Sequence, residues 1–78
     1  MIKDTVDQGF TVEKAYSGIT ARVSYSRSVA AYYLTVESEK TISEGVIHRC
    51  LLDLGVNIVE TIITLDRLHK YAVEFPED

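Results

Sequence analysis

Residues 41–63, TISEGVIHRCLLDLGVNIVETII, constrain the fold most, because they predict a helix with marked ends and a strand directly after it. Thr41 and Glu44 form a capping box: the hydroxyl accepts from the N–H of Glu44, and the carboxylate reaches back to the N–H of Thr41. Gly55 predicts the end of the helix, since glycine adopts the left-handed conformation without a steric cost. We therefore expect a helix over about residues 42–54, with the other strands packed on it or paired with its continuation.

This helix has one apolar face. Leu52 lies on the opposite, polar face beside His48 and Arg49, either as an isolated exposed side chain or as a contact with another subunit. The single cysteine, Cys50, points inward, which favours a small buried apolar group over a reactive thiol. The apolar face consists of Ile42, Val46, Ile47, Cys50, Leu51 and Leu54.

Residues 10–25 predict a β-hairpin with Ser17-Gly18 as its two-residue loop. In this register Glu13 lies directly opposite Arg22 on a polar face, which supports the pairing. The other face is apolar except for Lys14, and it holds Phe10, Val12, Tyr16, Ile19, Ala21, Val23 and Tyr25.

Three more strands follow from the remaining pattern. Residues 30–37 are apolar on both faces, which is typical of a strand inside a sheet. Residues 56–65 and 70–75 form a second hairpin around Asp66-Arg67, with Glu60 opposite Val73. Pro76 ends this hairpin, because proline cannot continue the ladder.

The connections give the topology. The crossover through the helix should be right-handed, with the last strand between the third and the fourth. We expect an α+β fold of order β-β-β-α-β-β, with one mainly antiparallel five-stranded sheet in the order 1-2-3-5-4 and a single helix on one face. The 78 residues make one domain. Residues 1–8 are polar without a clear period and predict a flexible or loosely docked start.

Composition narrows the classes of partner. The net charge is −4 and no Lys/Arg cluster exists, whereas binding to a phosphate backbone depends on such residues; we expect no nucleic-acid partner. The longest uninterrupted apolar run, residues 29–34, is too short to span a bilayer, and no secretory signal is visible. The expectation is a soluble cytoplasmic protein without a membrane partner.

No catalytic, metal or cofactor motif stands out. His48 and Cys50 point apart on a helix and cannot share a metal. Asp66 and His69 have no nucleophile signature beside them, and the scattered glycines cannot form a phosphate-binding loop. We expect no metal and no cofactor.

Geometry predicts self-association. A helix of this length is roughly 20 Å long and 10 Å wide, whereas five strands span about 24 Å. One helix cannot cover such a sheet, so the apolar face of the first hairpin should stay uncovered, as partner surfaces are. We expect a homo-oligomer, most simply a two-fold dimer, with an interface of Phe10, Val12, Tyr16, Ile19, Val23, Tyr25 and Leu52.

Lys14 and Glu60 are each the one charge on an otherwise apolar strand face. They form either a buried pair, between subunits or at a ligand pocket that also holds Tyr71, or two sheet-margin side chains that reach water. The ligand-binding prediction therefore names Lys14, Glu60 and Tyr71.

Residues 30–75 resemble half of an ACT domain or of the related ferredoxin-like NIL domain. The resemblance lies in Tyr33-Leu34-Thr35-Val36, in Gly55-Val56-Asn57-Ile58 between helix and strand, and in Tyr71-Ala72-Val73-Glu74-Phe75. It implies a regulatory or dimerisation module, with a small ligand near the loop before the helix and at a subunit interface.

Two functions follow as hypotheses. The first is a small, non-catalytic oligomeric module with an interaction or regulatory role, with or without a small ligand at a subunit interface. The second is a small enzyme whose active site forms only between subunits, where Lys14, Glu60 and Tyr71 converge.

Overall fold

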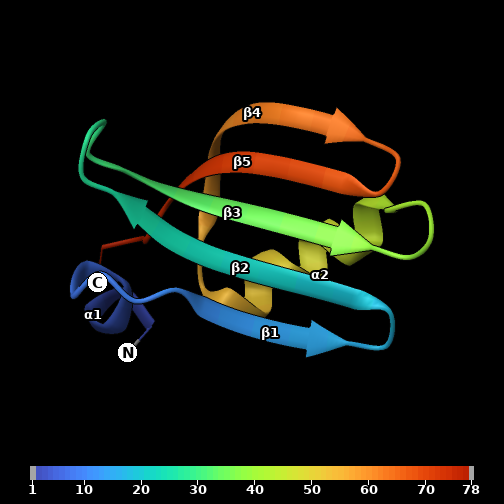
Figure 1. Cartoon of the computed structure of the whole chain (residues 1–78), viewed down its shortest axis with the longest axis horizontal. Helices are drawn as coiled ribbons and strands as arrows, with labels where there is room; N and C mark the ends of the chain where they lie inside the picture. The colour runs from blue at the N-terminus through green and yellow to red at the C-terminus, as the bar shows by residue number, and fades with distance from the viewer. Residues whose placement is uncertain (1, 78) are drawn as a thin grey trace.

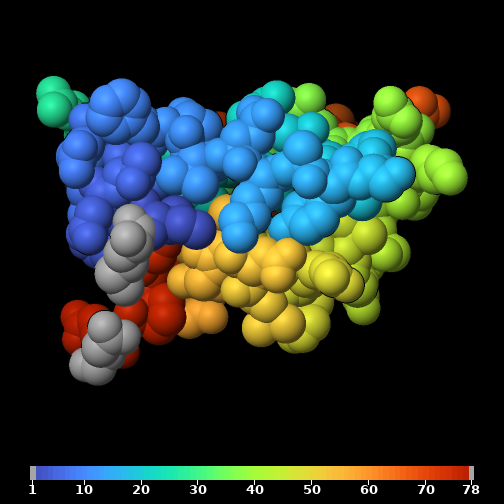
Figure 2. All heavy atoms as spheres, turned by 90° about the horizontal axis from the view of Figure 1, so that it is seen from below, coloured from blue at the N-terminus to red at the C-terminus, as the bar shows by residue number. Residues whose placement is uncertain are grey.

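A computed structural model describes residues 2–77 and shows two layers, an antiparallel sheet and the helices on one of its faces (Figure 1). The strand order is β1-β2-β3-β5-β4, which confirms the predicted fold class and topology. Figure 2, a view from below, shows β1 and α2 stacked as the two layers. In chain order the elements are α1 (Ile2–Asp7), β1 (Val12–Tyr16), β2 (Ile19–Ser26), β3 (Ala31–Ser38), α2 (Glu44–Leu54), β4 (Asn57–Leu65) and β5 (Leu68–Glu74).

The first hairpin has the predicted register. Tyr16 lies opposite Ile19 and Glu13 opposite Arg22, and Gly18 closes the loop with a φ of 74°. On the helix-free face, Arg22 bonds Glu13 at 2.8 Å and Glu37 at 2.9 Å. These exposed ion pairs contribute little stability each, but they join β1, β2 and β3 across the sheet.

The core lies between the sheet and α2. Leu34 and Val36 on β3 are fully buried, as is Val23 on β2. From α2, Cys50 and Leu54 pack against them. Cys50 is only 1% exposed, in agreement with its predicted role as a small buried group.

Helix α2 ends as predicted but begins two residues later. Gly55 has a φ of 69°, and its N–H donates to the carbonyl of Leu51 at 2.9 Å. The prediction of a capping box at Thr41 is wrong, because Ser43 is the N-cap residue and its hydroxyl accepts a hydrogen bond from the N–H of Val46. The cause is tertiary: Ile42 is buried, and its N–H donates to the carbonyl of Asp66 at 2.8 Å, which holds residue 42 against the turn between β4 and β5 before the helix begins.

A short helix, α1, occupies the segment where we expected a flexible start; Met1 lies outside the described residues. Val6 is fully buried in the core, and the Tyr32 hydroxyl donates to the Asp7 carboxylate. Lys3 lies 2.8 Å from the same carboxylate, and Lys3 and then Tyr32 lower the pKa of Asp7. Helix α1 therefore covers the end of the first hairpin.

The second hairpin departs from the predicted register. Leu65 lies opposite Leu68 as expected, but two β-bulges interrupt β4. Each bulge adds one residue to β4 without a counterpart on β5. Glu60 therefore lies opposite Ala72 instead of Val73, and Thr61 opposite Tyr71. The shift moves Glu60 to the helix-free face.

Candidate functional site

Strand β4 is the most exposed apolar element of the described chain. It forms an edge of the sheet and pairs only with β5. Seven large apolar side chains are exposed among the described residues, and four of them belong to β4. These four are Ile58, Val59, Ile62 and Leu65.

The opposite edge, β1, is protected. It has five residues, two of them charged, and the C-terminal turn of α2 lies against it. The Tyr16 hydroxyl donates to Asp53 Oδ2 at 2.7 Å, and Lys14 Nζ donates to the Asp53 carbonyl at 3.3 Å. Burial, and then the hydrogen bond to Asp53, raises the pKa of Tyr16 to about 12, so this hydroxyl stays protonated.

A groove of about 690 Å³ separates α2 from β4 and β5. Its apolar walls come from both layers, with Ile47 and Leu51 on α2 and Ile58 on β4. Thr61 and Thr64 of β4 supply hydroxyls. The remaining lining residues are Ile42, Glu44, Gly45, His48, His69 and Tyr71.

His69 and Tyr71 form a buried polar pair in this groove. His69 Nδ1 lies 2.7 Å from the Tyr71 hydroxyl. His69 is 9% exposed and is the one buried polar residue within residues 2–77. Burial raises the pKa of Tyr71. His69 Nε2 has no protein hydrogen-bond partner within that range, so it remains available to the groove.

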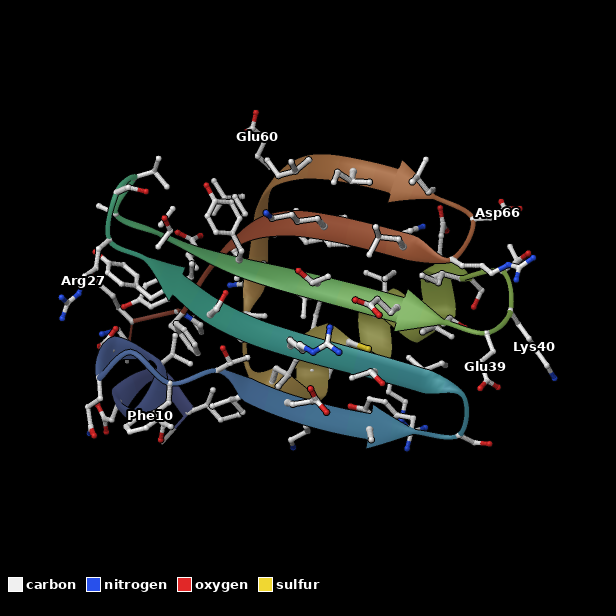
Figure 3. The ribbon with its side chains drawn as sticks, viewed as in Figure 1. Phe10, Arg27, Glu39, Lys40, Glu60 and Asp66 are labelled. Carbon is white, nitrogen blue, oxygen red and sulfur yellow. The ribbon has the colours of Figure 1, made fainter. Side chains whose placement is uncertain are left out.

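The three residues predicted to bind a ligand do not meet within one chain. Lys14 lies on β1 and Glu60 on β4, at opposite edges of the sheet. Figure 3 shows Glu60 projecting from the β4 edge, far from Phe10 beside α1. Only Tyr71 faces the groove.

The face of the first hairpin is not uncovered, and that expectation was wrong. Val23 is fully buried, and α1 and α2 pack on the same side. Only Phe10, at 61%, and Leu52, at 68%, remain largely exposed in the predicted interface set. A subunit contact at this hairpin stays a prediction. The half-buried members are Val12, Tyr16, Ile19 and Tyr25.

Sequence reasoning missed the exposure of β4 because it assumed that α2 covers this half of the sheet. Val59 and Ile63 could have indicated this exposure, since in the predicted register both add apolar groups to the face that a helix would not cover. Such a strand is either buried on both faces or exposed as an apolar edge. The structure has the second arrangement.

Comparison with family models, with curated proteins and with solved structures finds no significant match. The fold is that of a small α+β protein whose antiparallel sheet has helices on one face and β4 at one edge. It is compatible with a ferredoxin-like arrangement. None of the described helices has the length and apolar character needed to cross a membrane. The resemblance to ACT and NIL domains stays an expectation based on the residues.

Proposed function

We propose that this protein is a small, non-catalytic interaction module that works as a homo-oligomer and assembles through β4. The observation that carries the proposal is the edge itself. β4 has nine residues with a single charge and no lysine or proline. Long apolar edges without lysine or proline are sites where another strand can pair.

The contrast between the two edges supports this choice. β1 is short and charged, and Lys14 and Tyr16 tie it to α2. These are the features with which proteins block edge pairing. The two edges thus differ in length, charge and attachment to α2, and β4 is the less protected of the two, although its two bulges also disfavour edge pairing.

The assembly test compares two valines with almost equal exposure. Val59, on β4, is 61% exposed, and Val29, in the turn before β3, is 59% exposed. Val59→Lys should weaken self-association at least about tenfold, because a charge on a pairing edge must be desolvated. Val29→Lys should leave self-association unchanged. Light scattering over a micromolar concentration series measures both.

Circular dichroism at low concentration should show the same fold for both variants, since neither valine is buried. A wild-type chain that is monomeric throughout the series contradicts the proposal. Equal weakening by the two substitutions also contradicts it, because the effect would then depend on charge and not on β4.

The groove supports a second candidate function, the binding of a small ligand with an apolar body and one hydrogen-bonding group. The observation in its favour is His69, which is 9% exposed and whose Nε2 has no hydrogen-bond partner among residues 2–77. Apolar walls with few polar groups are typical of small-molecule sites. Of the three residues predicted to bind a ligand, this site contains only Tyr71. Thr61 and His69 take the places of Lys14 and Glu60.

Phenol is a suitable probe for the groove, because its hydroxyl can donate to or accept from either tautomer of His69. Titration at millimolar concentration should shift the NMR signals of His69, Thr61 and Ile58 along one saturable curve. Toluene, which lacks the hydroxyl, should bind several-fold more weakly. Shifts scattered over the surface, or equal affinity for both probes, would remove this candidate.

The enzyme hypothesis has a specific geometric requirement. Because Lys14 and Glu60 lie at opposite edges, pairing between sheet edges brings them together only when β1 of one chain pairs with β4 of the next. Such a head-to-tail contact does not close on itself in a pair and leads to rings or filaments. A closed dimer through β4 would therefore exclude this active site.

A further inference from the structure

The groove between α2 and the hairpin of β4 and β5 has two chemically different ends. The N–H of Ile42, directly before the N-cap residue, donates to the carbonyl of Asp66 at 2.8 Å, which holds the start of α2 at the turn between β4 and β5 (Figure 1). Thr64 and His69 lie opposite each other next to this turn, and both line the groove. Their polar groups therefore lie at the same end of the groove as the start of α2.

The other end of the groove is apolar. Ile58 lies near the start of β4 and Leu51 in the last turn of α2, and both line the groove. Because α2 leads away from the turn and back to the start of β4, these side chains lie at the end opposite His69. From Gly45 to Leu51 the helix rises roughly 9 Å, at about 1.5 Å per residue. The groove therefore suits an elongated molecule with a polar head and an apolar chain.

The buried pair at the polar end presents a hydrogen-bond donor to the groove. Nδ1 of His69, at 2.7 Å, is the one hydrogen-bond partner of the Tyr71 hydroxyl within residues 2–77. Tyr71 is 6% exposed, and burial raises the pKa of its hydroxyl, so the hydroxyl keeps its proton and donates it to Nδ1, since a buried donor without an acceptor is costly. The proton of a neutral His69 ring then lies on Nε2, and in a charged ring Nε2 carries a proton as well.

Nε2 of His69 is also accessible. It has no hydrogen-bond partner among residues 2–77, yet no side-chain nitrogen or oxygen of the described buried residues is both sealed from solvent and without a partner. Nε2 therefore has accessible surface, and His69, which is 9% exposed, lines the groove. An otherwise buried ring thus offers one N–H to the groove.

The start of α2 adds backbone donors at the same end. The first N–H groups of a helix have no partner inside the helix. That of Val46 donates to the Ser43 hydroxyl at 3.3 Å, whereas those of Glu44 and Gly45 have no partner among residues 2–77. Glu44 and Gly45 both line the groove. Packing does not require a glycine at position 45, because a Cβ there would meet only Ser43 Oγ, at 3.8 Å; the glycine leaves this backbone open.

A donor-rich end and an apolar end select the ligand. An ionised carboxylate accepts several hydrogen bonds and donates none, and a helix N-terminus favours negative charge. We propose that the groove binds a monocarboxylic acid with an unbranched apolar chain, with its carboxylate between His69 and the start of α2 and its chain along Leu51 and Ile58. This inference rests on the second candidate function, the groove as a small-ligand site, and names the class of ligand and its orientation.

Glu44 is the one acidic side chain among the residues that line the groove, and it lies at the same end as His69. It is exposed, so solvent screens its charge in part. That charge should weaken the binding of a carboxylate there and strengthen the binding of an amine. The opposite effects on the two head groups make Glu44 the most informative residue to change.

Probes that share one chain and differ in the head group test the proposal. In NMR titrations at neutral pH, octanoate should shift the signals of His69, Thr64 and Ile58 along one saturable curve. It should bind at least about tenfold more tightly than octylamine and about threefold more tightly than octanol, because hydrogen bonds to a charged acceptor are the stronger ones.

Two glutamates provide a matched pair of variants. Glu44→Gln should tighten the binding of octanoate at least about threefold, because it removes a like charge from the polar end. Glu13→Gln removes the same charge from β1, at the edge of the sheet away from β4, and should leave the affinity unchanged. Both glutamates are exposed, so both variants should keep the fold, which circular dichroism checks.

The outcomes separate this inference from the second candidate function. Preference for octanoate, with tighter binding in Glu44→Gln alone, supports the inference. Octanol or octylamine binding as tightly as octanoate overturns the carboxylate and leaves the groove as a ligand site. An unchanged affinity of Glu44→Gln, or equal tightening by Glu13→Gln, overturns the orientation in the same way. No saturable binding of phenol or of any octyl probe overturns both.

Discussion

Leu34→Ala is expected to destabilise the fold by about 2–5 kcal/mol, the range for a buried leucine whose cavity does not close. Leu34 is fully buried on β3, with strands on both sides and α2 above it. A chain of 78 residues has a total stability of about 4–12 kcal/mol. The substitution should therefore remove a large share of it, and urea denaturation followed by circular dichroism measures the change.

Leu52→Ala is the matched control, because it removes the same atoms from a side chain that is 68% exposed. Its effect should stay within about 0.5 kcal/mol. Equal losses for the two variants would mean that Leu34 is not in the core as described. The stabilities of the two variants should be compared at low protein concentration, where self-association does not contribute to stability.

Val6→Asp should release α1 from the sheet and cost about 1.5–3 kcal/mol, the value of burying one such side chain. Val6 is fully buried, and an unpaired carboxylate cannot stay there without a large desolvation cost. The contact between Asp7 and Tyr32 should be lost at the same time. Urea denaturation gives the stability change, and the NMR signals of Tyr32 report the release.

Thr5→Asp is the control on the same helix, since Thr5 is exposed. It adds the same charge and should leave both stability and the Tyr32 signals almost unchanged. If Val6→Asp also has no effect, then Val6 is not part of the core as described and α1 does not stabilise the fold.

Local patterns predicted those parts of the fold that depend on neighbouring residues. The register of the first hairpin followed from Ser17-Gly18 and the alternation around it. Gly55 marked the end of α2 for the same kind of reason. The strand order then followed from the connections alone.

The failures all have a tertiary cause. The start of α2 depends on Ile42, whose N–H is taken by Asp66 from the turn between β4 and β5. Helix α1 has one fully buried side chain, Val6, and six residues, too few for a periodic signal. The bulges of β4 have no sequence signal, because its run of β-branched residues is compatible with several registers.

The candidate site was predictable only in part. Tyr71 is buried, as expected for an inward-facing residue of β5, and it lines the groove, while its role in ligand binding stays a prediction. The exposure of β4 follows from the position of α2, whose last turn is held at β1 by Tyr16, Lys14 and Asp53. The two contacts join residues that are 39 and 37 positions apart in the sequence, so no local sequence pattern indicates them.

The central place of β5 has a consequence for biosynthesis. β5 is translated after the other strands, yet it lies between β3 and β4 and pairs with both. Until the ribosome has released it, β3 has only one neighbour and β4 has none. The sheet can therefore close only after residues 68–74 have emerged, and until then the edges of β3 and β4 that pair with β5 are exposed. Such edges make chains that lack β5 prone to aggregation.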